Sequence, residues 1–203
     1  LLVYAWHAEK KRTEALAGLA NELGLAFHAE GKDAPFIATW PAFYLFEQGG
    51  SKTFSNVMYG QVDGIEAALF DYRYTTGSGK NKTTHHQTVV CFRAPEMNLP
   101  YFALRPENFF HKIGTLFGYQ DINFDTHPDF SKKYLLRGQD EGAIRMTFGA
   151  PLLDYFEGTA GLSVEGGTDR LLFYRQNKRA EPHEIRVLLA DALQVLERFR
   201  QKA

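Results

Sequence analysis

Apolar residues at the start of the chain change from a continuous run to a helical repeat. The run LLVYAW turns polar at HAEKKR. Beyond it, apolar side chains recur at i, i+3, i+4 and i+7 up to a glycine stop signal. These positions are Leu16, Leu19, Ala20, Leu23 and Gly24. The spacing predicts a helix over residues 8–24 that continues directly from the apolar run.

The region 54–93 has the pattern of β-strands separated by turn residues. Its three apolar or alternating stretches are joined first by Asp63 and Gly64, which favour a tight hairpin. Three antiparallel strands are predicted here, and Leu99–Leu104 adds a fourth. Upstream, the aromatic segment 36–47 reads as extended chain, with Pro41 at an edge or a break.

A helix is predicted after the fourth strand. Pro106 suits its first position and Glu107 complements its positive end. One apolar stripe then precedes a glycine stop. The stripe and its stop are Phe109, Phe110, Ile113, Leu116, Phe117 and Gly118.

The second half repeats the order of strand and helix. A strand is predicted over 132–137, then a helix capped by Asp140 that breaks at Gly149 and restarts at Pro151. A hairpin around Gly166 and Gly167 and a final amphipathic helix after Pro182 complete the chain. The prediction is an α+β fold with antiparallel sheet packed against helices. It forms one domain over 8–203, with possible similar lobes at 8–120 and 121–203.

The first residues also have the composition of a membrane-spanning helix at its end. Trp6 is followed by Lys10, Lys11 and Arg12, and aromatic residues at the interface with basic residues just inside are typical of the cytoplasmic side. Because a span needs ~20 residues, residues 1–7 are interpreted as the last turns of an anchor, with the domain on the cytoplasmic side. The alternative is that 1–6 is the apolar start of a helix in a soluble domain.

Composition limits the classes of partner. The chain has 203 residues, 44% of them hydrophobic, and a net charge of -1 with both signs interspersed. It therefore lacks the basic field that binds a nucleic-acid backbone. The single cysteine, Cys91, forms neither an internal disulfide nor a thiolate metal site.

The segment 75–86 is a polar loop that superficially resembles a phosphate-binding loop. That motif needs glycine and Ser or Thr at the positions held by Tyr74 and Asn81, so nucleotide binding is excluded. Its length exceeds what a hairpin needs, and it contains no apolar residue. We expect it to contact anionic lipid headgroups or a membrane protein partner; a freely solvated tip is the alternative. The predicted contact residues are Arg73, Lys80, Lys82, His85 and His86.

Acidic residues around position 120 raise the possibility of a divalent metal ion. Asp121, Asn123 and Asp125 lie at alternating positions. Thr126 and Lys132, however, stand where a calcium loop of the EF-hand type requires Gly and Glu. Glu107 and His111 are four residues apart on the predicted helix. Turn, cap and surface roles account for the same residues, so no metal or other cofactor is assigned.

Several strings together resemble a group of uncharacterised bacterial proteins that carry an N-terminal membrane segment before an α+β domain. They include NVMYG, FDYRYTTGSGK, GYQDINF and FSKKYLLRG, and the resemblance spans about residues 10 to 199. It implies an anchor and a bacterial source, and it transfers no catalytic residue.

These observations favour a membrane-anchored cytoplasmic binding or scaffolding domain without catalytic activity. No serine lies in the Gly-x-Ser-x-Gly setting of a hydrolase nucleophile. One alternative is a divalent-metal-dependent enzyme that uses the acidic residues above. Another is a structural subunit of a membrane complex that uses the aromatic residues within 36–46.

Overall fold

The computed structural model describes residues 2–33, 43–107 and 120–201, and their strands form one antiparallel sheet of eight. The strand order is β1-β2-β3-β4-β8-β7-β5-β6. The strands are β1 (Ala26–Glu30), β2 (Gly50–Val62), β3 (Ile65–Thr76), β4 (Thr83–Arg93), β5 (Leu99–Pro106), β6 (Tyr134–Gly138), β7 (Ser163–Thr168) and β8 (Arg170–Tyr174). Because β4 pairs with β8 and β5 pairs with β6 and β7, both halves of the chain contribute to one sheet.

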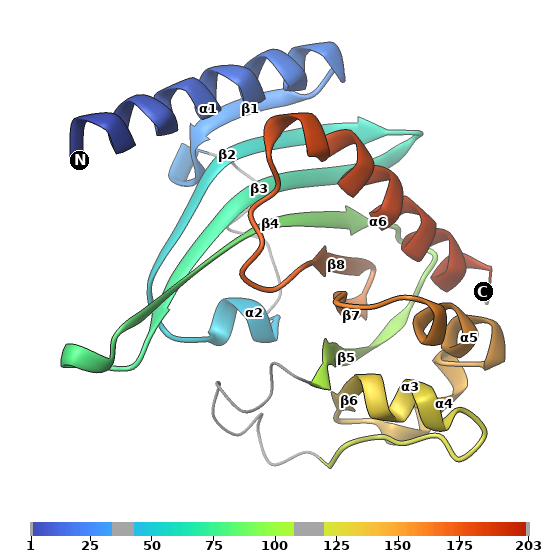
Figure 1. Ribbon diagram of the computed structural model, residues 1–203. Helices are drawn as coiled ribbons and strands as arrows, with labels where there is room; N and C mark the ends of the chain where they lie inside the picture. The colour runs from blue at the N-terminus through green and yellow to red at the C-terminus, as the bar shows by residue number, and fades with distance from the viewer. Residues whose placement is uncertain (1, 34–42, 108–119, 202–203) are drawn as a thin grey trace.

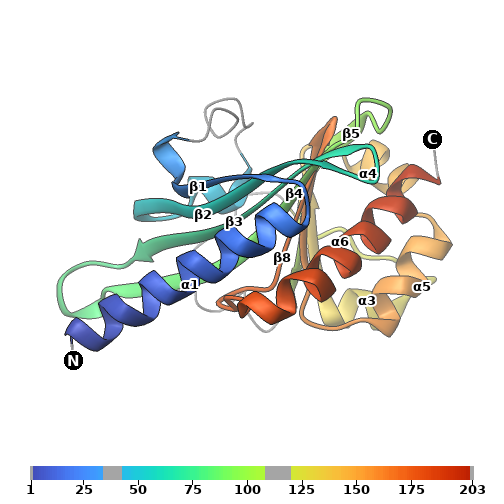
Figure 2. The same cartoon turned by 90° about the horizontal axis from the view of Figure 1, so that it is seen from above.

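Helices cover the two faces of this sheet unequally (Figures 1 and 2). The helices are α1 (Leu2–Glu22), α2 (Tyr44–Glu47), α3 (Pro128–Lys133), α4 (Glu141–Thr147), α5 (Ala150–Gly158) and α6 (Ile185–Arg200). The main core lies between one face, the first face, and α1, α6 and α3–α5. The short α2 packs on the opposite, second face over a smaller cluster. This arrangement confirms the predicted α+β class.

The central strands are apolar at successive positions because both of their faces are buried. In β3, Leu69 packs into the main core and its neighbour Phe70 into the smaller cluster. Val90 and Val89 in β4 divide in the same way. The three strands predicted between 54 and 93, and the fourth from Leu99, are confirmed, and β1 is added at the sheet edge.

Residues 44–47 form the helix α2 instead of the predicted extended chain, whereas Phe43 before it is extended; the rest of that segment, 36–42, lies outside the described residues. The backbone N–H of Leu45 donates to both carboxylate oxygens of Glu165, at 3.2 Å each. A negative carboxylate at the N-terminal end of a helix is stabilised by the partial positive charge of the helix dipole. Local sequence patterns could not predict this contact because the two residues are 120 positions apart.

A buried ion pair attaches α1 to the sheet. Arg12 is only 7% exposed, and its Nε and Nη2 each donate to a carboxylate oxygen of Asp71 at 2.9 Å. Asn56 from β2 and Thr88 from β4 donate to the same carboxylate, also at 2.9 Å. Nη2 of Arg12 also donates to the Ala180 carbonyl at 2.7 Å. Arg12 therefore does not belong to the exposed basic cluster that the sequence predicted.

Several predicted boundaries are wrong. Helix α1 runs without a break from Leu2, in agreement with the predicted continuation from the apolar run, but it ends at Glu22 and not at residue 24. Pro106 is the last residue of strand β5, and the predicted apolar stripe that follows lies outside the described residues. Lys132 and Lys133 end α3, and the strand starts at Tyr134. The Asp140 cap, the break at Gly149 and the final helix are confirmed.

The glycine pair in β7 accommodates aromatic rings and does not form the predicted turn, which lies at Thr168 and Asp169. A Cβ atom on Gly166 would collide with the ring of Phe102, and one on Gly167 with the ring of Tyr101. Both rings come from the paired strand β5. Glycine inside a strand commonly marks such a close approach.

Replacing Arg12 by methionine is expected to lower the free energy of unfolding by about 3–5 kcal/mol, because it leaves the buried Asp71 carboxylate without its cation. Chemical denaturation measures the change. Lys10→Met is the control, since the Lys10–Glu14 pair is exposed at 4.0 Å and such pairs contribute about 0–1 kcal/mol. Equal effects of the two substitutions would contradict the structural role assigned to Arg12.

Candidate functional site

Two elements project toward the same end of the molecule, the N-terminal half of α1 and the β3–β4 hairpin (Figures 1 and 2). Basic side chains gather on and beside them. We call this surface the basic end. Its residues are Lys10, Lys11, Arg73, Lys80, Lys82, His86 and Arg179.

The hairpin is a paired two-stranded arm for half of the predicted loop. Thr75 pairs with Thr84 and Thr76 with Thr83, so the unpaired turn is limited to 77–82. β-branched threonines favour strand conformation, which explains why the strands continue past the core. Gly77 has φ +75°, and a Cβ there would collide with the Asn81 carbonyl oxygen. Lys80 and Lys82 are therefore presented at the tip of an ordered arm.

Closer to the body of the domain, basic side chains crowd together beside α1. Arg73 and His86 are cross-strand partners. Arg179 donates to Glu9 of α1 at 2.7 Å. Partial burial lowers the pKa of His86 below its ordinary value of 6.5, and the charges of Arg179 and Arg73 lower it further. Burial is the larger cause, and all three effects favour the neutral imidazole, so the positive field of this surface comes from its Lys and Arg side chains.

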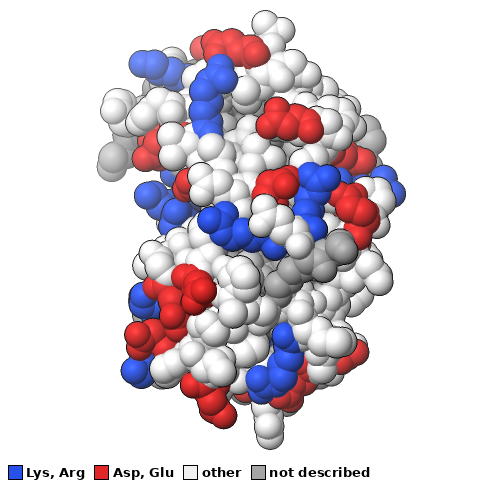
Figure 3. Space-filling view, turned by 90° about the vertical axis from the view of Figure 1, so that its right-hand side faces the viewer, with Lys and Arg blue, Asp and Glu red and all other residues white. Residues whose placement is uncertain are grey.

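Carboxylates offset only part of this field, and one of them, Glu14, is paired with Lys10 at 4.0 Å. The sequence has no acidic residue between Asp71 and Glu96. Asp71 is buried against Arg12, and Glu9 is paired with Arg179. The opposite end of the molecule differs, because Figure 3 shows Lys, Arg, Asp and Glu interspersed there. The basic end is thus suited to bind anions.

Exposed apolar side chains lie on α1 at this end. Tyr4 is 80% exposed and Trp6 60% exposed, and Val3 is exposed beside them. Nζ of Lys10 lies 5.6 Å from the centre of the Trp6 ring. Within the described ranges, none of the helices is long and apolar enough to cross a membrane. The anchor stays a prediction.

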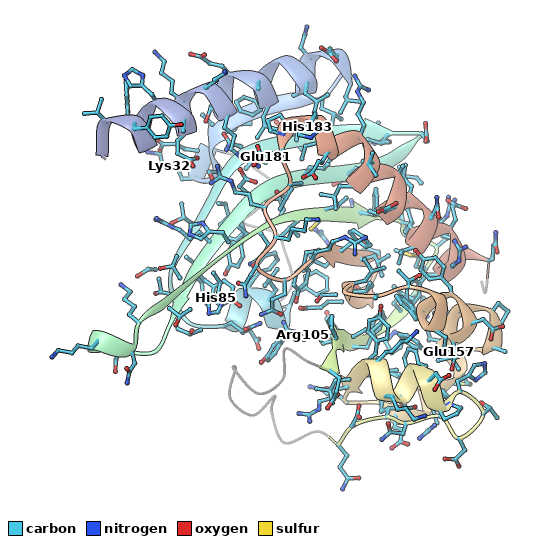
Figure 4. All side chains as sticks on the ribbon, in the orientation of Figure 1. Lys32, His85, Arg105, Glu157, Glu181 and His183 are labelled. Atoms are coloured by element: carbon cyan, nitrogen blue, oxygen red, sulfur yellow. The ribbon has the colours of Figure 1, made fainter. Side chains whose placement is uncertain are left out.

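His85 does not share the surface of the other predicted contact residues. Its ring is buried on the second face and stacks on Tyr74, with 4.7 Å between ring centres. The ring nitrogens lie 2.8 Å from Thr76 Oγ1 and from Asn177 Oδ1. Figure 4 shows His85 where the arm meets the body of the domain. The two-residue alternation along β4 could have separated it from His86, because His85 shares its face with the buried Gln87.

Two of the predicted metal ligands lie near each other: burial raises the pKa of Asp121, and the charge of Glu107 raises it further. Asp121 accepts a hydrogen bond from the backbone N–H of Leu136 at 3.0 Å, so it secures strand β6. Asp125 is exposed, and His111 lies outside the described residues. Among the residues that the structure describes, no group of three His, Cys, Asp or Glu side chains has the geometry of a metal site.

A buried polar cluster on the second face was not predicted from the sequence. Arg105 donates to Tyr174 at 2.8 Å and to Glu165 at 3.2 Å, and Tyr174 donates to Glu165 at 2.9 Å. The Tyr44 ring lies 4.0 Å from the guanidinium carbon of Arg105. Arg105 lies close to α2 in Figure 4. Because Glu165 also caps α2, this cluster holds α2 on the sheet.

The buried groups of the second face are poorly suited to acid–base or nucleophilic chemistry. Burial raises the pKa of Tyr74 to about 12 and the pKa values of Tyr174 and Cys91 well above their ordinary ranges. These side chains stay protonated at neutral pH. A thiol with a raised pKa is a structural residue and not a nucleophile.

NMR titration is expected to give His86 a pKa below 6.5, and Arg73→Gln should raise it by removing one positive neighbour. Since the unfolded chain then binds the proton more readily, this histidine lowers stability as pH falls from about 6.5 through the folded-state pKa. Lys80→Gln at the tip is the control and should leave the value unchanged. A pKa above 6.5 would contradict the positive field.

No family model matches the chain, and no curated protein matches it. One solved structure has a similar fold, the crystal structure of the mycobacterial trehalose monomycolate transport factor A, TtfA. The TM-score is 0.65, and the match covers 94% of this chain and 93% of that chain at 12% sequence identity. At that identity the similarity extends to the fold alone.

Proposed function

We propose that this chain is a binding or scaffolding domain without catalytic activity that works at the cytoplasmic surface of a membrane. The basic end faces the lipid, and the first turns of α1 lie in the interface or continue from an anchor. The main support for the proposal is that exposed aromatic side chains and basic side chains lie at the same end of the domain. The exposed Tyr4 and Trp6 and the lysines of the hairpin tip lie at one end of the domain.

The chemistry of that end fits an anionic bilayer surface. Aromatic rings settle at the level of lipid headgroups, and basic residues near anionic lipid contribute about 1 kcal/mol each. Lys10 and Lys11 follow Trp6 by about one turn of α1. The hairpin offers Lys80 and Lys82 as a second contact, so two separate elements limit rotation of the domain on the membrane.

The fold is compatible with such a role. The structure with the similar fold belongs to a protein described as a transport factor for trehalose monomycolate. A domain that assists transport binds or positions other molecules and needs no catalytic residues of its own. For this chain we infer positioning at a membrane and assign no cargo.

The two alternatives make different predictions. A metal-dependent enzyme should show a thermal shift with Mg²⁺, Ca²⁺, Mn²⁺ or Zn²⁺ that Asp121→Asn removes. A purely structural subunit of a membrane complex should be isolated together with its partners in mild detergent. A strictly monomeric mass under those conditions would count against that alternative. Neither alternative explains why basic and exposed aromatic side chains share one end.

Co-sedimentation with vesicles tests the proposal. Lys80→Glu with Lys82→Glu should weaken binding to phosphatidylserine-containing vesicles by at least about 30-fold, the equivalent of about 2 kcal/mol. Raising the salt concentration should weaken binding of the unsubstituted protein as well, because the contact is electrostatic.

The matched control reverses two lysines in α3, with Lys132→Glu and Lys133→Glu, and produces the same change in net charge. It should retain nearly full binding. Equal binding by both double variants would show that the hairpin does not face lipid. Binding to neutral phosphatidylcholine vesicles at the same affinity would rule out headgroup charge as the basis.

A further inference from the structure

A groove lies away from the basic end, between the start of β5, α4 and the end of α6. Its volume is about 570 Å³. Figure 3 shows the side of the molecule on which the C-terminal part of α6 lies, which is the right-hand side of Figure 1. The lining combines apolar residues (Met97, Leu99, Tyr101, Ala143, Met146 and Phe199) with the polar Asn98, Gln139, Asp140 and Thr147.

Two large apolar side chains stand exposed on the walls of this groove. Met146 of α4 is 79% exposed and Tyr101 of β5 is 47% exposed. The Tyr101 ring lies against Gly167, where a Cβ would collide with it, so its position is set by packing. Methionine and aromatic side chains are enriched where proteins bind one another, and thioethers adapt to varied surfaces.

The geometry favours a helical occupant over an extended one. β5 pairs with β6 only from Phe102 onward, so at most Leu99–Tyr101 offer a free strand edge. Three residues are fewer than the ~5–6 of an ordinary strand. Beyond Gly138 the chain turns into α4, which flanks that edge. A helix satisfies its own backbone and needs only an apolar trough.

The charge at the groove is acidic. Asp140 is the one charged residue among those that line it, and the lining contains no Lys, Arg or His. The nearby Arg145 is paired with Glu141, and Arg200 with Glu96 and Glu197. Oδ1 of Asp140 accepts the Ala143 N–H as the α4 cap. This backbone hydrogen bond leaves the charge of the carboxylate in place, and among the described residues no Lys, Arg or His forms an ion pair with Asp140.

We infer that this groove binds an amphipathic helix of a partner protein, with a row of large apolar side chains on one side and Lys or Arg at its flank. The apolar row contacts Met146 and Tyr101, and the basic flank contacts Asp140. Binding here does not depend on the basic end, so a domain seated on lipid would keep the groove open to a protein partner.

Fluorescence anisotropy with two synthetic peptides tests this inference without lipid. Both are helical, about 18 residues or five turns long, with leucines on one side; one has lysine flanks and the other has glutamate flanks. The protein should bind the lysine peptide about tenfold more tightly. Met146→Glu should weaken binding about tenfold, because the groove wall becomes charged.

Two further variants distinguish specific binding in the groove from non-specific hydrophobic binding elsewhere on the surface. Val187→Glu changes another exposed apolar residue, on α6 and 63% exposed, and should leave binding unchanged. Asp140→Asn keeps a good helix cap and should remove the preference for lysine flanks.

Unchanged binding by Met146→Glu would overturn the inference, as would an equal loss in Val187→Glu. Sedimentation velocity supplies one more outcome. A dimer that Met146→Glu dissociates would show that a second copy of this chain occupies the groove, and it would also overturn the inference. Vesicle binding by the same variants should be unchanged, so failure here is distinct from failure of the proposed function.

Discussion

The buried pair of Arg12 and Asp71 determines how the rest of the molecule is placed. It joins α1 to β3, and Asn56 and Thr88 join the strands on either side to the same carboxylate. Such a pair stabilises only when its hydrogen bonds are satisfied. Here the carboxylate has donors from α1, β2 and β4, so any shift of the helix along the sheet would break several bonds together.

This constraint gives α1 a fixed direction. The C-terminal half of the helix packs through Leu16 and Ala20 into the main core. The ten residues before Arg12 extend about 15 Å beyond it, with the Glu9–Arg179 pair as a further support. Two residues after Asp71 on the same strand comes Arg73, at the base of the hairpin arm. The helix and the arm are therefore positioned by the same strand, which explains why their charged and aromatic side chains reach one end.

The sequence predicted those elements whose formation depends on neighbouring residues. Periodic apolar residues and capping signals found α6, the Asp140 cap and the strands of the hairpins. Contacts between distant residues were not predictable. Arg12 read as an interface residue because its partner is 59 positions away, and α2 read as extended because its capping carboxylate is 120 positions away. The basic residues were identified from composition, but only the strand pairing shows that His85 turns inward while His86 stays with Arg73.

Depth-dependent quenching of Trp6 fluorescence tests the central claim most directly. With Trp40→Phe, Trp6 is the only tryptophan of the chain. On anionic vesicles that contain brominated lipids, we expect a blue shift of the emission and strong quenching, both reduced by Lys80→Glu with Lys82→Glu. Emission that stays at the wavelength of water-exposed indole, on vesicles that do bind the protein, would contradict the claim that the basic end faces the membrane.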